Sequence, residues 1–218
     1  MSRMKSLDTG FLKPEGGDRL YPQAARSPRI HDMTTPESRR LQTEAVILPI
    51  RLAHFVLRSN HFEETKVWYQ TVLGAHPVFE NPFVCFMTYD QEHHRIAIIN
   101  TVDAPDPAPG AAGLDHIAFT FATLGDLLST FRRLQGLDIQ PYWCINHGPT
   151  TSFYYRDPDG NQVELQFDNF ETPETLQGWF ERGDFAENPI GVTFDPEKLI
   201  ERFEAGHAIE ELVKQGSA

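Results

Sequence analysis

The chain has 218 residues, enough for one large domain or two small ones with a proper hydrophobic core. Its net charge of -12 and its pI near 5.1 argue against nucleic acid and anionic membranes as partners, because both repel an acidic surface. No apolar run is long enough to cross a bilayer, and the first residues contain no apolar secretion segment. We therefore expect a cytoplasmic protein that binds a small molecule.

The N-terminal segment, residues 1–45, is rich in Pro, Gly, Ser and charged residues and has no sustained helical or strand period. This composition predicts a flexible arm. From about residue 50 the pattern changes to compact elements. A strand (RLAHFVLRS), a helix that ends at Gly74 (HFEETKVWYQTVLG) and three strands around VFENP, FVCFMTYD and HHRIAIINT follow in order.

The segment VDAPDPAPGAAG, rich in Pro and Gly, separates these elements from a second unit that repeats their order. The second unit has a strand (GLDHIAFTF), a helix that ends at Gly136 (ATLGDLLSTFRRLQG) and three strands (IQPYWCINHG, TTSFYYRD and NQVELQFDN). The repeat predicts an α+β fold with two βαβββ modules. We place the modules at about 50–102 and 113–168, within a domain at 46–170 that is followed by a helical extension at 171–218.

Both cysteines, Cys85 and Cys144, lie inside strand-like runs and are too few for a disulfide framework. We interpret them as small buried apolar residues. Neither is expected to act as a nucleophile.

The last hairpin is built around the turn Asp157–Gly160 (DPDG), whose Asp, Pro and Gly are typical of a type I turn. After the turn, side chains alternate between the two faces of the strand. Val163, Leu165 and Phe167 fall on one face, and Gln162, Glu164 and Gln166 fall on the other. From the hairpin alone, the simplest interpretation is a half-buried strand with Glu164 in water.

Histidine occurs at the same position in the first strand of each unit, as His54 and His116. A single histidine in a strand is more often structural. Here the histidine is repeated and Glu164 falls on the corresponding face of its strand, so we interpret all three residues as metal ligands. All three side chains are expected opposite the apolar faces that pack on helices. If the two sheets curl with these faces inward, two His and one carboxylate converge, as in the facial triad of non-haem Fe(II) oxygenases.

Residues 50–168 resemble the vicinal oxygen chelate superfamily and, within it, most closely the small type I extradiol dioxygenases. The resemblance lies in the first strand around His54, in HHRIAII at 93–99, in LDHIAF around His116 and in HGPTTSFYYRDPDGNQVEL at 147–165. It implies a cup formed by paired βαβββ modules. It also implies cleavage of a catechol-type aromatic diol by O2.

Carried over residue by residue, the resemblance implies that His54, His116 and Glu164 bind Fe(II), with Mn(II) as the alternative ion. It implies that His94 is an acid/base group beside the O2 site. For His147 and Tyr154 it implies hydrogen bonds to the hydroxyl oxygens of the substrate. We also expect a homo-oligomer.

Two alternatives remain open. The first is a metal-dependent lyase, isomerase or transferase similar to glyoxalase I or fosfomycin-resistance proteins, an alternative that a fourth protein ligand on the last strand of the first unit would favour. That strand offers Ile96 and Ile98 on the expected face of His94, which favours ring cleavage. The second is a metal-free binding protein similar to bleomycin-resistance proteins, which the three retained ligand types argue against.

The C-terminal segment FDPEKLIERFEAGHA predicts a helix with Asp195 as N-cap and Gly206 as its stop. Leu199, Ile200 and Phe203 form an apolar stripe that is expected to pack on its own domain. We hypothesise that this tail or the N-terminal arm partly covers the cup or a neighbouring subunit.

Overall fold

The structure is a computed structural model that describes residues 46, 48–105 and 112–218. The arm expected at 1–45 and the middle of the linker between the modules lie outside the described residues. The chain divides into two units, residues 1–50 and 51–218. The second unit holds both repeats.

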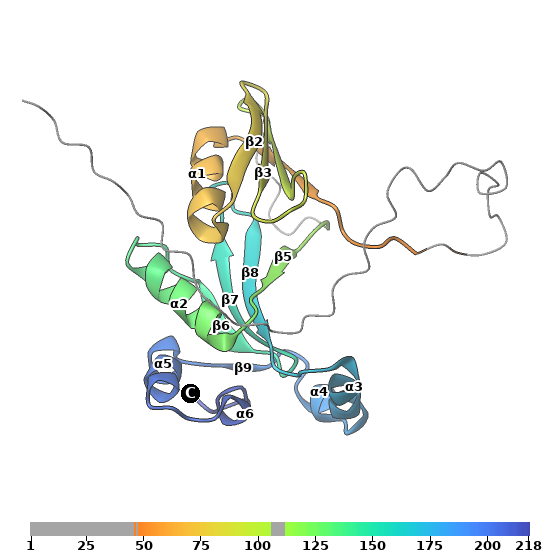
Figure 1. The fold of residues 1–218 in the computed structure, drawn as a ribbon, viewed down its shortest axis with the longest axis vertical. Helices are drawn as coiled ribbons and strands as arrows, with labels where there is room; N and C mark the ends of the chain where they lie inside the picture. The colour runs from red at the N-terminus through yellow and green to blue at the C-terminus, as the bar shows by residue number, and fades with distance from the viewer. Residues whose placement is uncertain (1–45, 47, 106–111) are drawn as a thin grey trace, which may run out of the picture. The chain divides into compact units, whose positions relative to one another are not determined.

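The first module contains one helix and four strands. They are β1 (Phe55–Ser59), α1 (Phe62–Leu73), β2 (His76–Asn81), β3 (Val84–Thr88) and β4 (Ile96–Asn100). The strands form a sheet in the order β1-β4-β3-β2, in which β1 and β4 are parallel. Helix α1 covers one face of this sheet (Figure 1), and Leu57, Ile96 and Ile98 point into the core beneath it.

The second module repeats this arrangement and adds one strand. Its elements are β5 (His116–Thr120), α2 (Leu124–Gln135), β6 (Trp143–Asn146), β7 (Thr150–Arg156) and β8 (Gln162–Asp168). The sheet order is β5-β8-β7-β6-β9, where β9 (Val192–Thr193) comes from the C-terminal extension. The predicted α+β fold with two βαβββ modules is confirmed, whereas the sequence did not predict β9.

Local signals explain where these elements end. Helix α1 stops at Gly74, which has the left-handed φ of 67° that glycine adopts without strain. The backbone N–H of Gly160 donates to the carbonyl of Asp157 at 2.9 Å, which closes the predicted turn. Cys85 is fully buried and Cys144 partly buried, and neither forms a disulfide.

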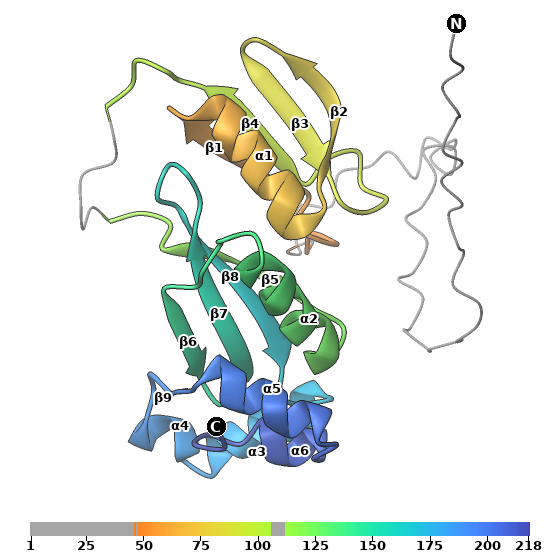
Figure 2. The same ribbon diagram turned by 90° about the vertical axis from the view of Figure 1, so that its left-hand side faces the viewer.

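The C-terminal extension contains α3 (Pro173–Glu181), α4 (Asp184–Glu187), α5 (Pro196–Glu204) and α6 (Ile209–Leu212). Figure 2 shows these helices at the end of the second sheet that lies away from the first module. The side chain of Asp195 caps α5 by accepting from Glu197 N at 3.0 Å, and Leu199 and Ile200 are buried in the core, as predicted. No helix in the described part of the chain is long and apolar enough to span a membrane.

The turn before β8 fastens the second module to the first. One carboxylate oxygen of Asp159 accepts from the backbone N–H groups of Asn60 and His61 at 2.8 and 3.2 Å. The other accepts from the hydroxyl of Thr65 at 2.8 Å. Asn60 directly follows β1, and Asp159 lies shortly before β8. Because β5 and β8 are parallel and their first residues are paired, the contact places the end of β1 near the start of β5.

At the opposite end, the start of β1 meets the end of β5. The rings of Phe55 and Phe119 lie 6.1 Å apart between centroids. The Arg133 guanidinium of α2 also donates to the last carbonyls of α1, at Thr71 and Val72. Strands β1 and β5 therefore lie beside each other and run in opposite directions.

Candidate metal and substrate site

The second sheet brings together two of the predicted ligands. Nε2 of His116 lies 3.0 Å from a carboxylate oxygen of Glu164, since β5 and β8 are paired neighbours and both residues lie on the same face. Glu164 is only 4% exposed, so the alternative of a solvated Glu164 is wrong. An imidazole nitrogen and a buried carboxylate oxygen that face each other are a donor pair that suits Fe(II).

His116 is oriented by a residue that the sequence reasoning missed. Its Nδ1 lies 2.8 Å from a carboxylate oxygen of Asp115. When the ring hydrogen is donated from Nδ1 to Asp115, the Nε2 lone pair is available to bind a cation beside Glu164. An acidic residue immediately before a predicted ligand was the available sequence signal.

Tyr154 and His147 lie beside this pair. Tyr154 is directly opposite Glu164 in the β7–β8 register, and its hydroxyl lies 3.0 Å from Nε2 of His147. Burial and then the negative charge of Glu164 raise the pKa of Tyr154 far above its usual value. Tyr154 therefore stays protonated and acts as a hydrogen-bond donor. The ring of Trp143 packs 5.1 Å from that of Tyr154 and forms an aromatic wall.

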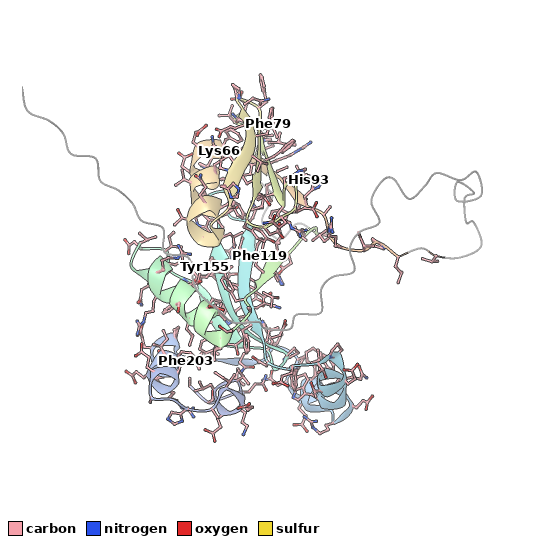
Figure 3. The ribbon with its side chains drawn as sticks, in the orientation of Figure 1. Lys66, Phe79, His93, Phe119, Tyr155 and Phe203 are labelled. Carbon is pink, nitrogen blue, oxygen red and sulfur yellow. The ribbon has the colours of Figure 1, made fainter. Side chains whose placement is uncertain are left out.

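The first sheet carries a second group of histidines. The ring of His54 lies 4.3 Å from that of His94, which stacks on Phe86 at 4.6 Å. Nδ1 of His93 lies 2.6 Å from Nδ1 of His94. Burial lowers the pKa of His94, and the neighbouring imidazoles of His54 and His93 disfavour a positive charge on it and lower the pKa further, so the His94 ring is neutral near pH 7. Figure 3 shows His93 on the side of the first sheet away from α1.

The sequence predicted that His94 lies on the same strand face as Ile96 and Ile98, and this prediction was wrong. Strand β4 begins only at Ile96, so its alternation does not extend back to His94. Ile96 and Ile98 are fully buried in the core, whereas the His94 ring stacks on Phe86, which pairs with Ala97. Ala97 is also apolar, so β4 offers no fourth ligand on this face.

Within one chain the predicted residues form two separate groups. His116, Glu164, Tyr154 and His147 come together on the second sheet, and His54 and His94 come together on the first. Across residues 46, 48–105 and 112–218, no three His, Cys, Asp or Glu side chains lie close enough together to hold a metal ion. The opposite directions of β1 and β5 explain this separation. His54 precedes Phe55, which meets Phe119, and the three residues from Phe119 back to His116 span roughly 10 Å of strand.

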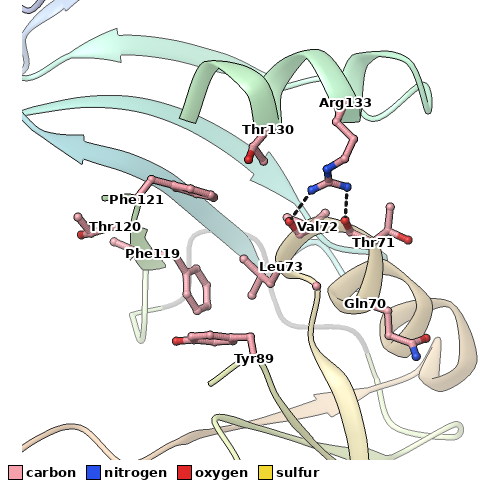
Figure 4. A pocket seen from close by; sticks show the side chains of 12 residues that line it. Gln70, Thr71, Val72, Leu73, Tyr89, Phe119, Thr120, Phe121, Thr130 and Arg133 are labelled. Atoms are coloured by element: carbon pink, nitrogen blue, oxygen red, sulfur yellow. Dashed lines mark hydrogen bonds between the residues drawn. The ribbon is translucent and has the colours of Figure 1, made fainter. Parts of the chain in front are cut away.

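A cavity of about 540 Å³ lies elsewhere, between the ends of α1 and α2 and strand β5 (Figure 4). Its lining includes Tyr89, Phe119, Phe121 and Arg133. None of the predicted site residues lines it. The candidate chemistry therefore lies on the faces of the sheets and not in this cavity.

Two βαβββ modules with a histidine at the start of each and a buried glutamate on the last strand define a protein of the paired-module class. The chain belongs to the Glyoxalase/Bleomycin resistance protein/Dioxygenase superfamily, whose model matches residues 51–165. This confirms the family that the sequence resembles.

Several individual proteins are similar to this chain. It is 46% identical over 163 residues to Biphenyl-2,3-diol 1,2-dioxygenase 2 of Rhodococcus globerulus, and the matched region covers 74% of this chain and 86% of the relative. It is 46% identical over 170 residues to Biphenyl-2,3-diol 1,2-dioxygenase 3 of the same organism, and this match covers 77% of this chain and 90% of that relative. The crystal structure of lactoylglutathione lyase from Agrobacterium tumefaciens matches 55% of this chain and 94% of that chain, with 20% identity and a TM-score of 0.45.

Proposed function

We propose that this protein is an Fe(II)-dependent extradiol dioxygenase that opens a catechol-type aromatic ring beside its two hydroxyl groups with O2. One observation carries the proposal. His116 faces the buried carboxylate of Glu164, with Tyr154 and His147 beside them, in a chain that is 46% identical to two biphenyl-2,3-diol dioxygenases. The relatives favour an aromatic diol over the substrates of glyoxalase-like enzymes.

His54, His116 and Glu164 are the residues that would hold the ion, with Mn(II) as the alternative to Fe(II). Two neutral imidazoles and one carboxylate suit either cation and leave coordination positions for small molecules. When bound, Fe(II) supplies Lewis acidity and a path for electrons between the diol and O2. Asp115 supports the site by keeping the His116 ring in a fixed orientation.

The remaining residues of the chain bind the diol and move its protons. Tyr154, whose raised pKa keeps it protonated, donates a hydrogen bond to one substrate oxygen. His147 accepts a hydrogen bond from a substrate hydroxyl at Nε2. His94 is neutral near pH 7 and takes a proton from the diol, and because its Nδ1 faces His93 we assign this transfer to its Nε2. Positioned acid/base groups of this kind contribute about two to four powers of ten in rate.

We further propose a homodimer in which His54 of one copy completes the His116–Glu164 pair of the other. A closed two-fold dimer forms this contact twice, because each copy gives its His54 to the site of its partner and receives the partner's His54 in its own site. The face of the first sheet opposite α1 supports this arrangement. On that face Val56, Phe79 and Ile99 are 51%, 51% and 38% exposed, an apolar surface that a second copy would cover.

Oxygen consumption tests the proposed reaction. The full chain is reconstituted anaerobically with Fe(II), mixed with a panel of catechols that includes biphenyl-2,3-diol, and then exposed to O2. We expect uptake of about one O2 per diol, together with the absorbance of the ring-opened product. Glu164→Gln is the matched control, and we expect it to lose bound iron and turnover. Turnover that is indifferent to O2 would refute ring cleavage and favour a lyase or isomerase.

A further inference from the structure

The imidazole ring of His147 is held from both sides. Its Nδ1 lies 2.5 Å from the backbone carbonyl oxygen of Ile190, in the C-terminal extension, and its Nε2 lies 3.0 Å from the hydroxyl of Tyr154. A carbonyl oxygen only accepts, so Nδ1 carries the hydrogen of the first bond. In the neutral ring Nε2 then has the lone pair, which accepts from the Tyr154 hydroxyl until a substrate hydroxyl takes that place.

The backbone on either side of His147 also contacts the extension. The side-chain amide of Asn146 donates to the carbonyl of Val213 at 2.7 Å, and the backbone carbonyl of Asn146 accepts from Gln215 at 3.1 Å. Gly148 has a φ of 96°, and a Cβ there would lie 2.4 Å from the ring of Trp179 on α3. The extension therefore contacts three consecutive residues centred on His147.

The Ile190 carbonyl is itself placed by the residues around it. Strand β9 pairs with β6, with Val192 opposite Asn146. Gly191 has a φ of 110°, and a Cβ at this position would lie 2.3 Å from the carbonyl oxygen of Asn146. The side chain of Asn188 accepts from the N–H of Gly191 at 3.0 Å and donates to its carbonyl at 2.9 Å. Only glycine allows the chain to approach His147 this closely.

We infer that the C-terminal extension, residues 171–218, is part of the active site, where the Ile190 carbonyl fixes the orientation and tautomer of His147. This inference rests on the proposed function, in which His147 accepts a hydrogen bond from the substrate. With the hydrogen held on Nδ1, a substrate hydroxyl that reaches Nε2 always meets an acceptor. If the ring were released, it would exchange tautomers and present a donor for part of the time. Asn188 and Gly191 are therefore positioning residues.

A pair of glycine substitutions tests this role. Gly191→Ala drives a Cβ into the Asn146 carbonyl and displaces Ile190, whereas Gly183→Ala is a matched control. Gly183 is also in the extension with a φ of 90°, but its Cβ would meet no atom of the described residues within 4 Å. We expect kcat/KM to fall by about 10- to 100-fold in Gly191→Ala relative to Gly183→Ala, as for displaced supporting groups. Asn188→Ala should show the same change to a smaller degree, and it carries the test if Gly191→Ala does not fold.

The tautomer is measured without turnover. Nitrogen NMR of the ¹⁵N-labelled full chain, with no iron added, distinguishes a neutral ring with hydrogen on Nδ1 from one with hydrogen on Nε2. The His147 signal is assigned by its loss in His147→Gln. We expect the Nδ1–H form in the parent and in Gly183→Ala, and a shift toward Nε2–H in Gly191→Ala and Asn188→Ala.

The two readouts separate the inference from the proposed function. Absent oxygen uptake in the parent would reject the reaction but leave the tautomer measurement valid. A parent ring with hydrogen on Nε2 would overturn the inference. So would Gly191→Ala and Asn188→Ala proteins that match Gly183→Ala in both tautomer and kcat/KM.

Discussion

Mixing two inactive variants tests whether the three predicted ligands come from one chain or from two. His54→Ala removes the ligand on the first sheet, and Glu164→Ala removes one on the second. Each variant alone should lose most of its iron and its turnover, because only three protein ligands are predicted. In a mixed dimer of the proposed kind, one site carries both substitutions and the other carries neither.

The expected recovery follows from counting sites. Equal mixing with free exchange makes about half of the dimers mixed, and each mixed dimer has one intact site of two, so oxygen uptake should recover to about a quarter of the parent value. The reason lies in the structure, because β1 and β5 run in opposite directions and keep His54 away from His116 within one chain. Bound iron should recover in the same proportion.

The assay uses co-expressed variants with two different affinity tags, so that mixed dimers are isolated before oxygen uptake and iron are measured. The isolated mixed dimers have one intact site of two, so their oxygen uptake should reach about half of the parent value, whereas the unseparated mixture should reach about a quarter. His116→Ala mixed with Glu164→Ala is the matched control. Both changes lie on the second sheet, so no site in that mixed dimer is intact and no recovery is expected. Purified mixed dimers of His54→Ala and Glu164→Ala that stay inactive beside an active parent would show that all three ligands come from one chain.

Four further predictions follow from the histidine cluster and the core. His94→Ala should keep its iron but turn over about two to four powers of ten more slowly, and an iron-free variant would make His94 a fourth ligand. Because the lowered pKa of His94 keeps the ring neutral at pH 7, kcat should fall only as the pH drops through a value below about 6.5, and a decline that begins above pH 7 would contradict this role. The buried hydroxyl of Tyr155 has no hydrogen-bond partner among the described residues, so Tyr155→Phe should raise the free energy of unfolding in urea by about 1 kcal/mol. Tyr69→Phe, which removes a 3.3 Å hydrogen bond to the buried Asp157, should lower it by about 1 to 2 kcal/mol, and equal effects of the two changes would refute this reasoning.

Local patterns in the sequence were enough to predict the two modules. The stops at Gly74 and Gly136 and the N-cap at Asp195 depend on groups a few residues apart, so each is visible in a short stretch of chain. Strand alternation predicted that His116 and Glu164 share a face, because both residues lie within regular, paired strands. The same rule failed for His94, which lies before the first residue of β4, where alternation has not begun.

The sequence by itself determined which residue types stand at equivalent places in the two modules. It also placed four of the site residues, those of the second sheet, on segments that come together. Only the tertiary structure decided that Glu164 is buried, that β1 and β5 run in opposite directions, and that Ile190 holds His147. The first two depend on how distant strands pack. The third depends on a backbone carbonyl, a group that every residue carries, so no residue type in the sequence marks it.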